Sequence, residues 1–137
     1  MLDQAATYLV TLPNFVAYFA ASLALTALFL LVYTGVTPYR EWELIRQGND
    51  AAAISLAGAA LGFVLPLASV IMNSLNLLDM VVWSIVAMIV QLGTFFVARL
   101  IKPQLVRDIA AGRTAPAISL AGMSLVVGVL NAACMTS

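Results

Sequence analysis

Four long apolar stretches, charged only at their ends, limit how this chain can fold more than any other feature. They run from about Asn14 to Thr34, Asp50 to Met72, Asp79 to Ala98 and Thr114 to Met135. Each has the roughly 20 residues that a helix needs to cross a hydrocarbon layer about 30 Å thick. Backbone polar groups in lipid must be satisfied within the protein, which leaves helices or closed barrels. The stretches are continuous rather than alternating with period two, so they predict four transmembrane helices.

The composition agrees with a lipid environment. Of 137 residues, 64% are hydrophobic and only 9% are charged, whereas a soluble domain is roughly 25% charged. A soluble helical bundle would need a polar stripe on each helix, and the second and fourth stretches offer only Ser, Gly and Ala. The net charge is zero and no Lys/Arg block exists, which excludes a nucleic-acid partner and leaves the lipid bilayer as the expected one.

All six basic residues lie in two connections between the apolar stretches. These connections run from Pro38 to Asn49 and from Arg99 to Arg113. The basic residues are Arg40, Arg46, Arg99, Lys102, Arg107 and Arg113. The positive-inside rule assigns both connections to the cytoplasm and therefore both termini to the outside.

The first apolar stretch is expected to remain in the protein as a helix. Residues 1–15 contain no Lys or Arg, and the stretch is longer than the apolar region of a cleaved signal peptide. Tyr33, Tyr39 and Trp42 lie near the first basic connection. Their position fits aromatic anchors at the membrane interface, and burial against a neighbouring helix explains it equally well.

An internal repeat divides the chain into two halves. GNDAAAISLAG at 48–58 aligns with GRTAPAISLAG at 112–122 with a shift of 64 residues, and eight of the eleven positions are identical. Each half contains a helix, a basic connection and a second helix. We therefore expect an all-α integral membrane protein, a single transmembrane domain over 1–137, built from tandem helical hairpins over 14–72 and 79–136. Repeats of the same orientation predict a pseudo-twofold axis along the membrane normal.

The repeated segment also predicts how two helices begin. Gly48 and Gly112 suit a left-handed residue that closes a short interfacial helix. Asp50 and Thr114 are the expected N-caps of the helices that follow. The connections themselves fit short amphipathic helices in the headgroup layer, with a solvated loop as the alternative.

Small residues recur at four-residue spacing on the second and fourth stretches. They are Ala53, Ala57, Gly58, Gly62, Ala117, Ala121, Ser124 and Gly128. Helices in lipid associate through such flat faces because no hydrophobic force drives them together. These residues predict that the second and fourth helices pack at the centre, although small residues are also common in any apolar helix.

The inventory of reactive side chains is short. The chain has no His and a single cysteine, Cys134, so we expect no metal site, no cofactor and no intramolecular disulfide. Cys134 is expected to act as a small apolar residue, with a redox role as the alternative. No catalytic constellation and no ionisable residue within a span can be named, so the chain is not expected to be an enzyme.

Gln91 is the most prominent polar residue within a span, near the middle of the bilayer. Its amide could line a permeation path, or it could bond a hydroxyl or a backbone carbonyl on a neighbouring helix; Thr26, Ser55 and Ser119 are the candidate hydroxyls. At the outer side, Asn73, Asn76, Asp79 and Asn131 could form a polar vestibule or a turn with helix caps. Four spans enclose little volume, so a transport path would favour an oligomer.

Two segments carry a resemblance to a known family. They are EWELIRQGNDAAAISLAGAALGFVLPL at 41–67 and RDIAAGRTAPAISLAGMSLVVGVLNA at 107–132. With them the chain resembles the YjfL-like bacterial inner-membrane family, domain of unknown function 350, over nearly its whole length. The resemblance implies a four-helix protein of the bacterial inner membrane with tandem repeats. It implies no reaction and supplies no catalytic residues.

Abundant packing signals and absent chemistry favour a non-enzymatic structural or accessory component of the envelope. We expect it to associate with itself or with another membrane protein through its small-residue faces. The alternative is a small channel or facilitator formed at an oligomer interface, for which Gln91 and the outer polar residues would line the path. An intramembrane enzyme is the third class and has no sequence feature in its favour.

Overall fold

The computed structural model describes residues 2–38, 40–73 and 76–135, and every regular element among them is a helix. The helices are α1 (Leu2–Val36), α2 (Glu41–Arg46), α3 (Asp50–Asn73), α4 (Leu77–Ile101), α5 (Leu105–Ala110) and α6 (Thr114–Met135). Four of them, α1, α3, α4 and α6, are long and apolar enough to cross a membrane. The prediction of an all-α protein with four spans is confirmed.

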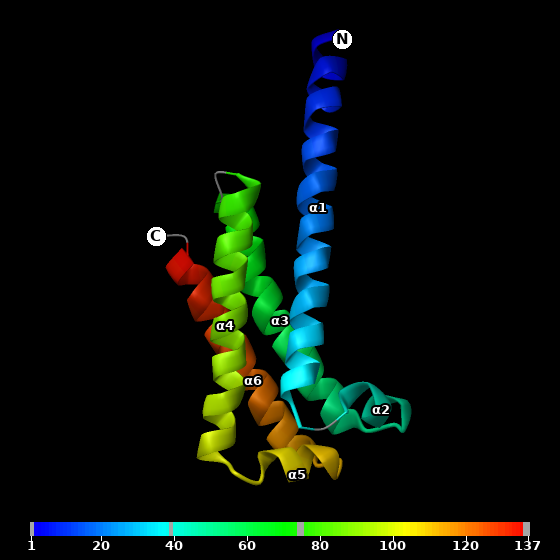
Figure 1. The fold of residues 1–137 in the computed structure, drawn as a ribbon, viewed down its shortest axis with the longest axis vertical. Helices are drawn as coiled ribbons and strands as arrows, with labels where there is room; N and C mark the ends of the chain where they lie inside the picture. Colours follow the sequence, from blue (N-terminus) through cyan, green and yellow to red (C-terminus); the bar gives the residue numbers. More distant parts are fainter. Residues whose placement is uncertain (1, 39, 74–75, 136–137) are drawn as a thin grey trace.

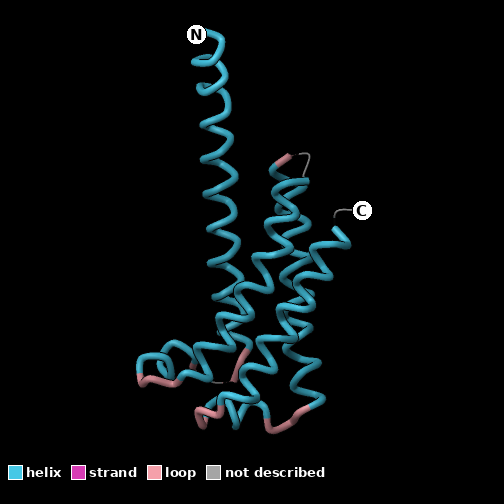
Figure 2. Tube along the Cα trace, turned by 180° about the vertical axis from the view of Figure 1, so that it is seen from behind, coloured by secondary structure: helices cyan, strands magenta, loops and turns pink. Residues whose placement is uncertain are grey.

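The central pair of helices is α3 and α6. They run side by side and tilted, with α1 and α4 upright in front of them (Figure 1) and the pair facing the viewer from behind (Figure 2). Their mutual interface is the most extensive one in the bundle, and α4 packs across both of them. Helix α1 contacts α3 and α4.

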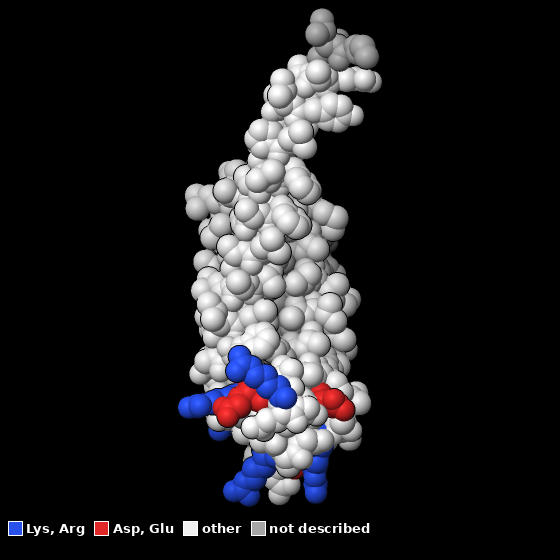
Figure 3. All heavy atoms as spheres, turned by 90° about the vertical axis from the view of Figure 1, so that its right-hand side faces the viewer, with Lys and Arg blue, Asp and Glu red and all other residues white. Residues whose placement is uncertain are grey.

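Helix α1 begins earlier than predicted. The sequence placed its start at Asn14, directly after Pro13, but the helix runs from Leu2 with Pro13 inside it. A proline removes one helical hydrogen bond, and the apolar run upstream of it continues the helix. At 1.5 Å per residue, the 35 residues of α1 span about 52 Å. Its first turns therefore project beyond the rest of the bundle (Figures 1 and 3).

On the face shown in Figure 3, the Lys, Arg, Asp and Glu side chains gather at the end of the bundle opposite the projecting part of α1. Helices α2 and α5 lie at this end (Figure 1), and all six basic residues fall within or beside them. This distribution is the structural basis for assigning one end to the cytoplasm by the positive-inside rule. The orientation itself stays a prediction.

The two basic connections share one backbone conformation. Gly48 and Gly112 have φ of +85° and +86°, a region that side chains with a Cβ atom rarely adopt. Gly48 N–H donates to Ile45 O and Gly112 N–H to Ile109 O, both at 3.0 Å, and the next N–H along the chain donates one residue farther back, at 2.9 Å in both connections. This pair of bonds is the Schellman motif, which ends α2 and α5 with their last carbonyls satisfied.

The cap of α3 lies one residue earlier than predicted. Asp50 was expected to cap this helix, but the side chain of Asn49 accepts the Ala52 N–H at 3.1 Å. Asp50 is the first residue of α3, and Thr114 is likewise the first residue of α6. The residue that follows each Schellman glycine directly precedes the next helix, so the cap position is Asn49 before α3 and Arg113 before α6. Arg113 has no side-chain acceptor, so a side-chain cap is seen only at Asn49.

Aromatic rings tie the last turns of α1 to the bundle. Phe29 stacks on Phe63 of α3 with ring centroids 4.6 Å apart, and Tyr33 meets Phe95 of α4 edge-on at 5.7 Å. Tyr33 is thus buried against neighbouring helices instead of lying at the interface as an anchor. Trp42 is exposed, and Tyr39 lies outside the described residues.

Candidate functional site

The closest approach of two helices is between the glycines of α3 and the small residues of α6. A methyl group on Gly58 would overlap Ala121, with the Ala121 Cα atom only 2.5 Å away. A methyl group on Gly62 would lie 2.5 Å from the carbonyl oxygen of Ser124, and one on Gly128 would overlap the backbone of Gly62. Only glycine fits at these three positions, because the neighbouring backbones occupy the space of a Cβ atom.

Not all of the predicted packing residues share this interface. In α6 the whole set is buried, namely Ala117, Ala121, Ser124 and Gly128. In α3, Gly58 and Gly62 are buried, whereas Ala53 is half-buried and Ala57 is exposed. The expectation for Ala57 was wrong for a geometric reason. Adjacent helix positions point about 100° apart, and it is Gly58 that faces α6, which leaves Ala57 on the exposed side of α3.

The interface between α3 and α6 does not have the predicted twofold symmetry. A twofold axis between these helices would pair the contact of Gly58 and Ala121 with a contact of their repeat equivalents, Gly122 and Ala57. Ala57 is exposed, and a methyl group on Gly122 would meet nothing within 4 Å. The two halves share the conformation of their connections, but they pack through different faces.

Gln91 lies buried where α3, α4 and α6 meet. Its Nε2 atom donates to the carbonyl of Gly62 at 2.9 Å and to the carbonyl of Ser124 at 3.1 Å. The residue is 1% exposed, and its Oε1 atom has no hydrogen-bond partner among the described residues. One side chain therefore links three helices through the backbone groups that the glycines bring close.

The hydroxyls considered as partners of Gln91 are not bonded to it. Thr26 donates to the carbonyl of Ser22 and Ser55 to that of Ala52, while Ser119 is exposed. Each of the two bonded hydroxyls satisfies a carbonyl in its own helix, which is the usual alternative for Ser and Thr inside helices. The partners of Gln91 are backbone carbonyls, the other option that the sequence left open.

The outer polar residues serve mostly local roles. Asn76 caps α4 by accepting the Asp79 N–H at 2.8 Å, and Asn73 donates to the Ser69 carbonyl at 2.8 Å. Asn131 is half-buried, and its Nδ2 atom has no hydrogen-bond partner in the described part of the chain. The contacts of Asn73 and Asn76 are those of helix ends.

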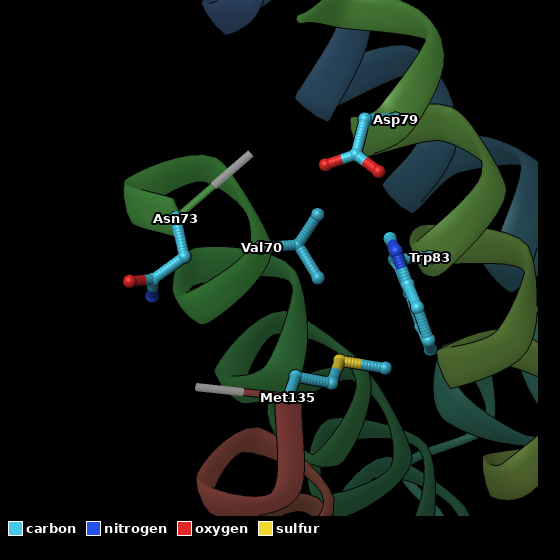
Figure 4. Close-up of a pocket in the computed structure, with 5 residues that line it drawn as sticks. All are labelled: Val70, Asn73, Asp79, Trp83 and Met135. Carbon is cyan, nitrogen blue, oxygen red and sulfur yellow. The ribbon is translucent and has the colours of Figure 1, made fainter. Parts of the chain in front are cut away.

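A small hollow of about 120 Å³ lies at this outer end. Asp79 and Trp83 of α4 face Val70 of α3 across it, and the amide of Asn73 points away (Figure 4). Gln91 does not line this hollow. It lies twelve positions after Asp79 on α4, which is about 18 Å along the helix. The buried side chains between them on α4 are Met80, Ser84, Ala87 and Met88.

Glu41 is a buried acid that the sequence did not single out. The residue is 1% exposed, one carboxylate oxygen accepts a hydrogen bond from the Thr37 hydroxyl, and the other has no partner in the described residues. Desolvation by burial raises the pKa of Glu41 to about 7, against the opposing hydrogen bond from Thr37. The only sequence signal is that Glu41 directly follows Arg40. An acid that is exposed to water is equally common at such a position, so the sequence does not indicate burial.

Asn49 is a second residue whose role the sequence did not reveal. Besides capping α3, its Nδ2 atom donates to the carbonyls of Ile109 at 3.1 Å and Ala110 at 3.2 Å. It thereby joins the end of α5 to the start of α3. The repeat could have pointed to it, because the equivalent position holds Arg113, one of three differences in an otherwise identical segment.

The described residues hold no group of three His, Cys, Asp or Glu side chains that could bind a metal ion. Cys134 is exposed near the end of α6. The features that distinguish this bundle are thus its close helix contacts and a few buried polar groups.

Comparison with known proteins gives the family. The family described as Domain of Unknown Function (DUF350) matches residues 7–135. The chain belongs to this family. The DUF350 protein is 38% identical over 126 residues to the UPF0719 inner membrane protein YjfL of Escherichia coli (strain K12), covering 92% of this chain and 96% of YjfL. It is 30% identical over 93 residues to the UPF0719 transmembrane protein YshE of Bacillus subtilis (strain 168), covering 68% of this chain and 69% of YshE.

No solved structure matches the DUF350 protein significantly. Its likeness to a named inner membrane protein and its four apolar helices together make it a multi-pass protein of the inner membrane.

Proposed function

We propose that this DUF350 protein is a non-enzymatic structural or accessory component of the inner membrane that associates with copies of itself through α1. The observation that carries the proposal is the long uncovered part of α1. Every residue from Gln4 to Ala17 is exposed. Burial begins only at Leu25 and then recurs every four residues, at Phe29, Tyr33 and, just after the end of α1, Thr37.

The uncovered part of α1 is apolar and extends past the other spans. The other spans have 24, 25 and 22 residues and so reach about 33 to 38 Å, against about 52 Å for α1. A hydrocarbon layer of about 30 Å cannot cover all of α1 while it stands upright beside α4. Burial of an apolar side chain that would otherwise face water contributes about 1.5–3 kcal/mol.

A second copy is the occupant that best matches this surface. Tyr8, Leu12, Phe15 and Phe19 are all more than half exposed, and they follow one another at helical spacing along one side of α1. Phe15 and Phe19 stack with centroids 5.6 Å apart. Another copy in the same membrane presents the same stripe at the same height, so two such helices cover each other in a symmetric contact.

The small-residue faces are not the proposed surface for self-association. Gly58, Gly62 and Gly128 already face each other inside one chain. The alternative function, a channel at an oligomer interface, draws no specific support from Gln91, whose amide is bonded to two carbonyls. We therefore propose the accessory role alone.

Disulfide cross-linking in native membranes tests the proposal. In a Cys134→Ser background, Leu12→Cys lies on the proposed stripe, and Val10→Cys lies on the opposite side of the same exposed turn. We expect a covalent dimer with Leu12→Cys and little with Val10→Cys. Equal cross-linking of both variants, or a monomer in lipid nanodiscs with no cross-link at Leu12, would overturn self-association through this stripe.

A further inference from the structure

The corner between α4 and α5 combines an apolar groove with exposed cations, and we propose that it binds one anionic phospholipid. The acyl chain would lie in the groove and the phosphate against Lys102, with Arg99 beside it. This inference is independent of self-association through α1, because the corner lies at the opposite end of the bundle (Figure 1).

The groove is formed by side chains from three helices. It has a volume of about 150 Å³ and is lined by Ala98 and Ile101 of α4, Leu105 of α5, and Leu120 and Met123 of α6. Such a surface suits a hydrocarbon chain, because burying apolar area is favourable and no polar group needs a partner. The groove opens at the charged end of the bundle, where lipid headgroups meet the protein.

Lys102 stands at the boundary between the groove and its polar surroundings. It lines the apolar groove and also a wider hollow of about 350 Å³ that includes Gln104 and Asp108. Arg99 lines a third hollow, about 520 Å³, which shares Pro103 with the second. Both cations are exposed.

These cations carry no acidic partner within the described part of the chain. The ion pairs there are Arg40 with Glu43 at 3.6 Å and Arg113 with Asp108 at 3.7 Å. Asp108, the acid on the rim of the hollow, is thus engaged with Arg113. Lys102 and Arg99 are available to an anion from the membrane, which is how basic pockets between spans recognise anionic headgroups.

The second basic connection, which contains this corner, has an excess of positive charge that the first connection lacks. Residues 99–113 contain four basic residues and one acid, whereas residues 38–49 contain two basic residues and two acids. The net positive charge of the second connection therefore attracts an anionic lipid more strongly than the first connection does. The charge difference argues for a bound anionic lipid in preference to a neutral one or to general attraction along the charged end.

Native mass spectrometry of the full chain in detergent tests the proposal with phosphatidylglycerol and phosphatidylcholine as probes. We expect the wild type to retain one phosphatidylglycerol in preference to phosphatidylcholine. Lys102→Gln should weaken phosphatidylglycerol retention about fivefold, the effect of one cation near a lipid surface. Ser119→Trp should weaken it as well, because Ser119 is exposed on the groove wall and an indole would fill the groove.

The matched control is Arg46→Gln, an exposed arginine in the other connection, for which we expect unchanged retention. Equal losses with Arg46→Gln and Lys102→Gln would overturn the site in favour of general electrostatics. Loss with Lys102→Gln but not with Ser119→Trp would overturn the acyl groove. If Ser119→Trp fails to fold, Lys102→Gln, at an exposed position, still decides whether this corner holds the lipid.

Discussion

The side-chain amide of Gln91 donates a hydrogen bond to the backbone carbonyl of Gly62, 2.9 Å away on a different helix. The same Nε2 atom reaches the carbonyl of Ser124, which lies beside Gly62 because neither Gly62 nor Gly128 has a side chain. The hydrogen bonds of Gln91 therefore depend on the close contact of Gly62 and Gly128, which brings the two carbonyls together. Three helices are thus held at one point near the middle of the bundle.

Replacing Gln91 by Leu should lower the free energy of unfolding by about 1 kcal/mol, because interhelical hydrogen bonds in membranes average about 0.6 kcal/mol each. The loss is modest for two reasons. Both carbonyls lie within helices, and the substitution also removes the buried Oε1 atom, which has no hydrogen-bond partner among the described residues. Unfolding by SDS in mixed micelles measures it, with the exposed Gln104→Leu as control. Equal stability of the two variants would show that the bonds of Gln91 contribute nothing.

Alanine at the interface glycines should destabilise the monomer. We expect Gly58→Ala and Gly62→Ala each to cost about 1–3 kcal/mol through overpacking, because the new methyl meets the backbone of α6. Gly93→Ala and Gly122→Ala, which meet nothing within 4 Å, should keep or raise stability by up to about 1 kcal/mol through helix propensity. The same unfolding assay compares all four, and a loss shared by all of them would contradict a specific contact.

Glu41 should make stability depend on pH. Burial raises its pKa from 4.5 to about 7, so between these values the folded protein binds more protons than the unfolded chain. The free energy of unfolding should therefore fall as pH rises from about 4.5 to about 7, by at most about 3 kcal/mol, and level off above. Glu41→Gln should remove this slope and the exposed Glu43→Gln should keep it. An unchanged slope in Glu41→Gln would assign it to another group.

The cap of α3 gives a direct comparison of two neighbouring residues. Asn49→Ala should lower stability by about 1–2 kcal/mol, since it loses the cap and the bonds to Ile109 and Ala110. Asp50→Ala, at the position that the sequence favoured, should change stability by less than half as much. Thermal unfolding monitored by circular dichroism measures the stability of both variants. A larger loss with Asp50→Ala than with Asn49→Ala would show that Asp50 is the cap.

Orientation in the membrane can be tested with single cysteines in a Cys134→Ser background. Asn76→Cys at the outer link should react with an impermeant maleimide added to intact cells. Gln104→Cys, in the second basic connection, should react only after the membrane is opened. The opposite pattern would place both termini in the cytoplasm.

The four spans were predictable from hydropathy, because every helix that crosses lipid needs a long apolar stretch. The side of each helix that packs against its neighbours was not predictable in this way. Ala57 and Gly58 are equally small and apolar, so neither hydropathy nor spacing says which one meets α6. The first helix was predicted too short, from about Asn14, because the search was for the roughly 20 residues that cross a bilayer, whereas α1 also includes Pro13 and the residues before it.

Buried polar groups were the hardest to foresee. The burial of Glu41 and the bonds of Asn49 arise from segments that the chain brings together only in the folded state. The partners of Asn49 lie 60 and 61 residues away. Gln91 was visible from its place in the middle of a span, but its carbonyl partners became accessible only through the glycines of another interface.

The bonds of Asn49 to the end of α5 have a consequence for biogenesis. Asn49 is synthesised 60 residues before Ile109, so the first connection can complete its hydrogen bonds only after the second connection has been made. A chain that stopped before Ile109 would hold its first hairpin without these two bonds.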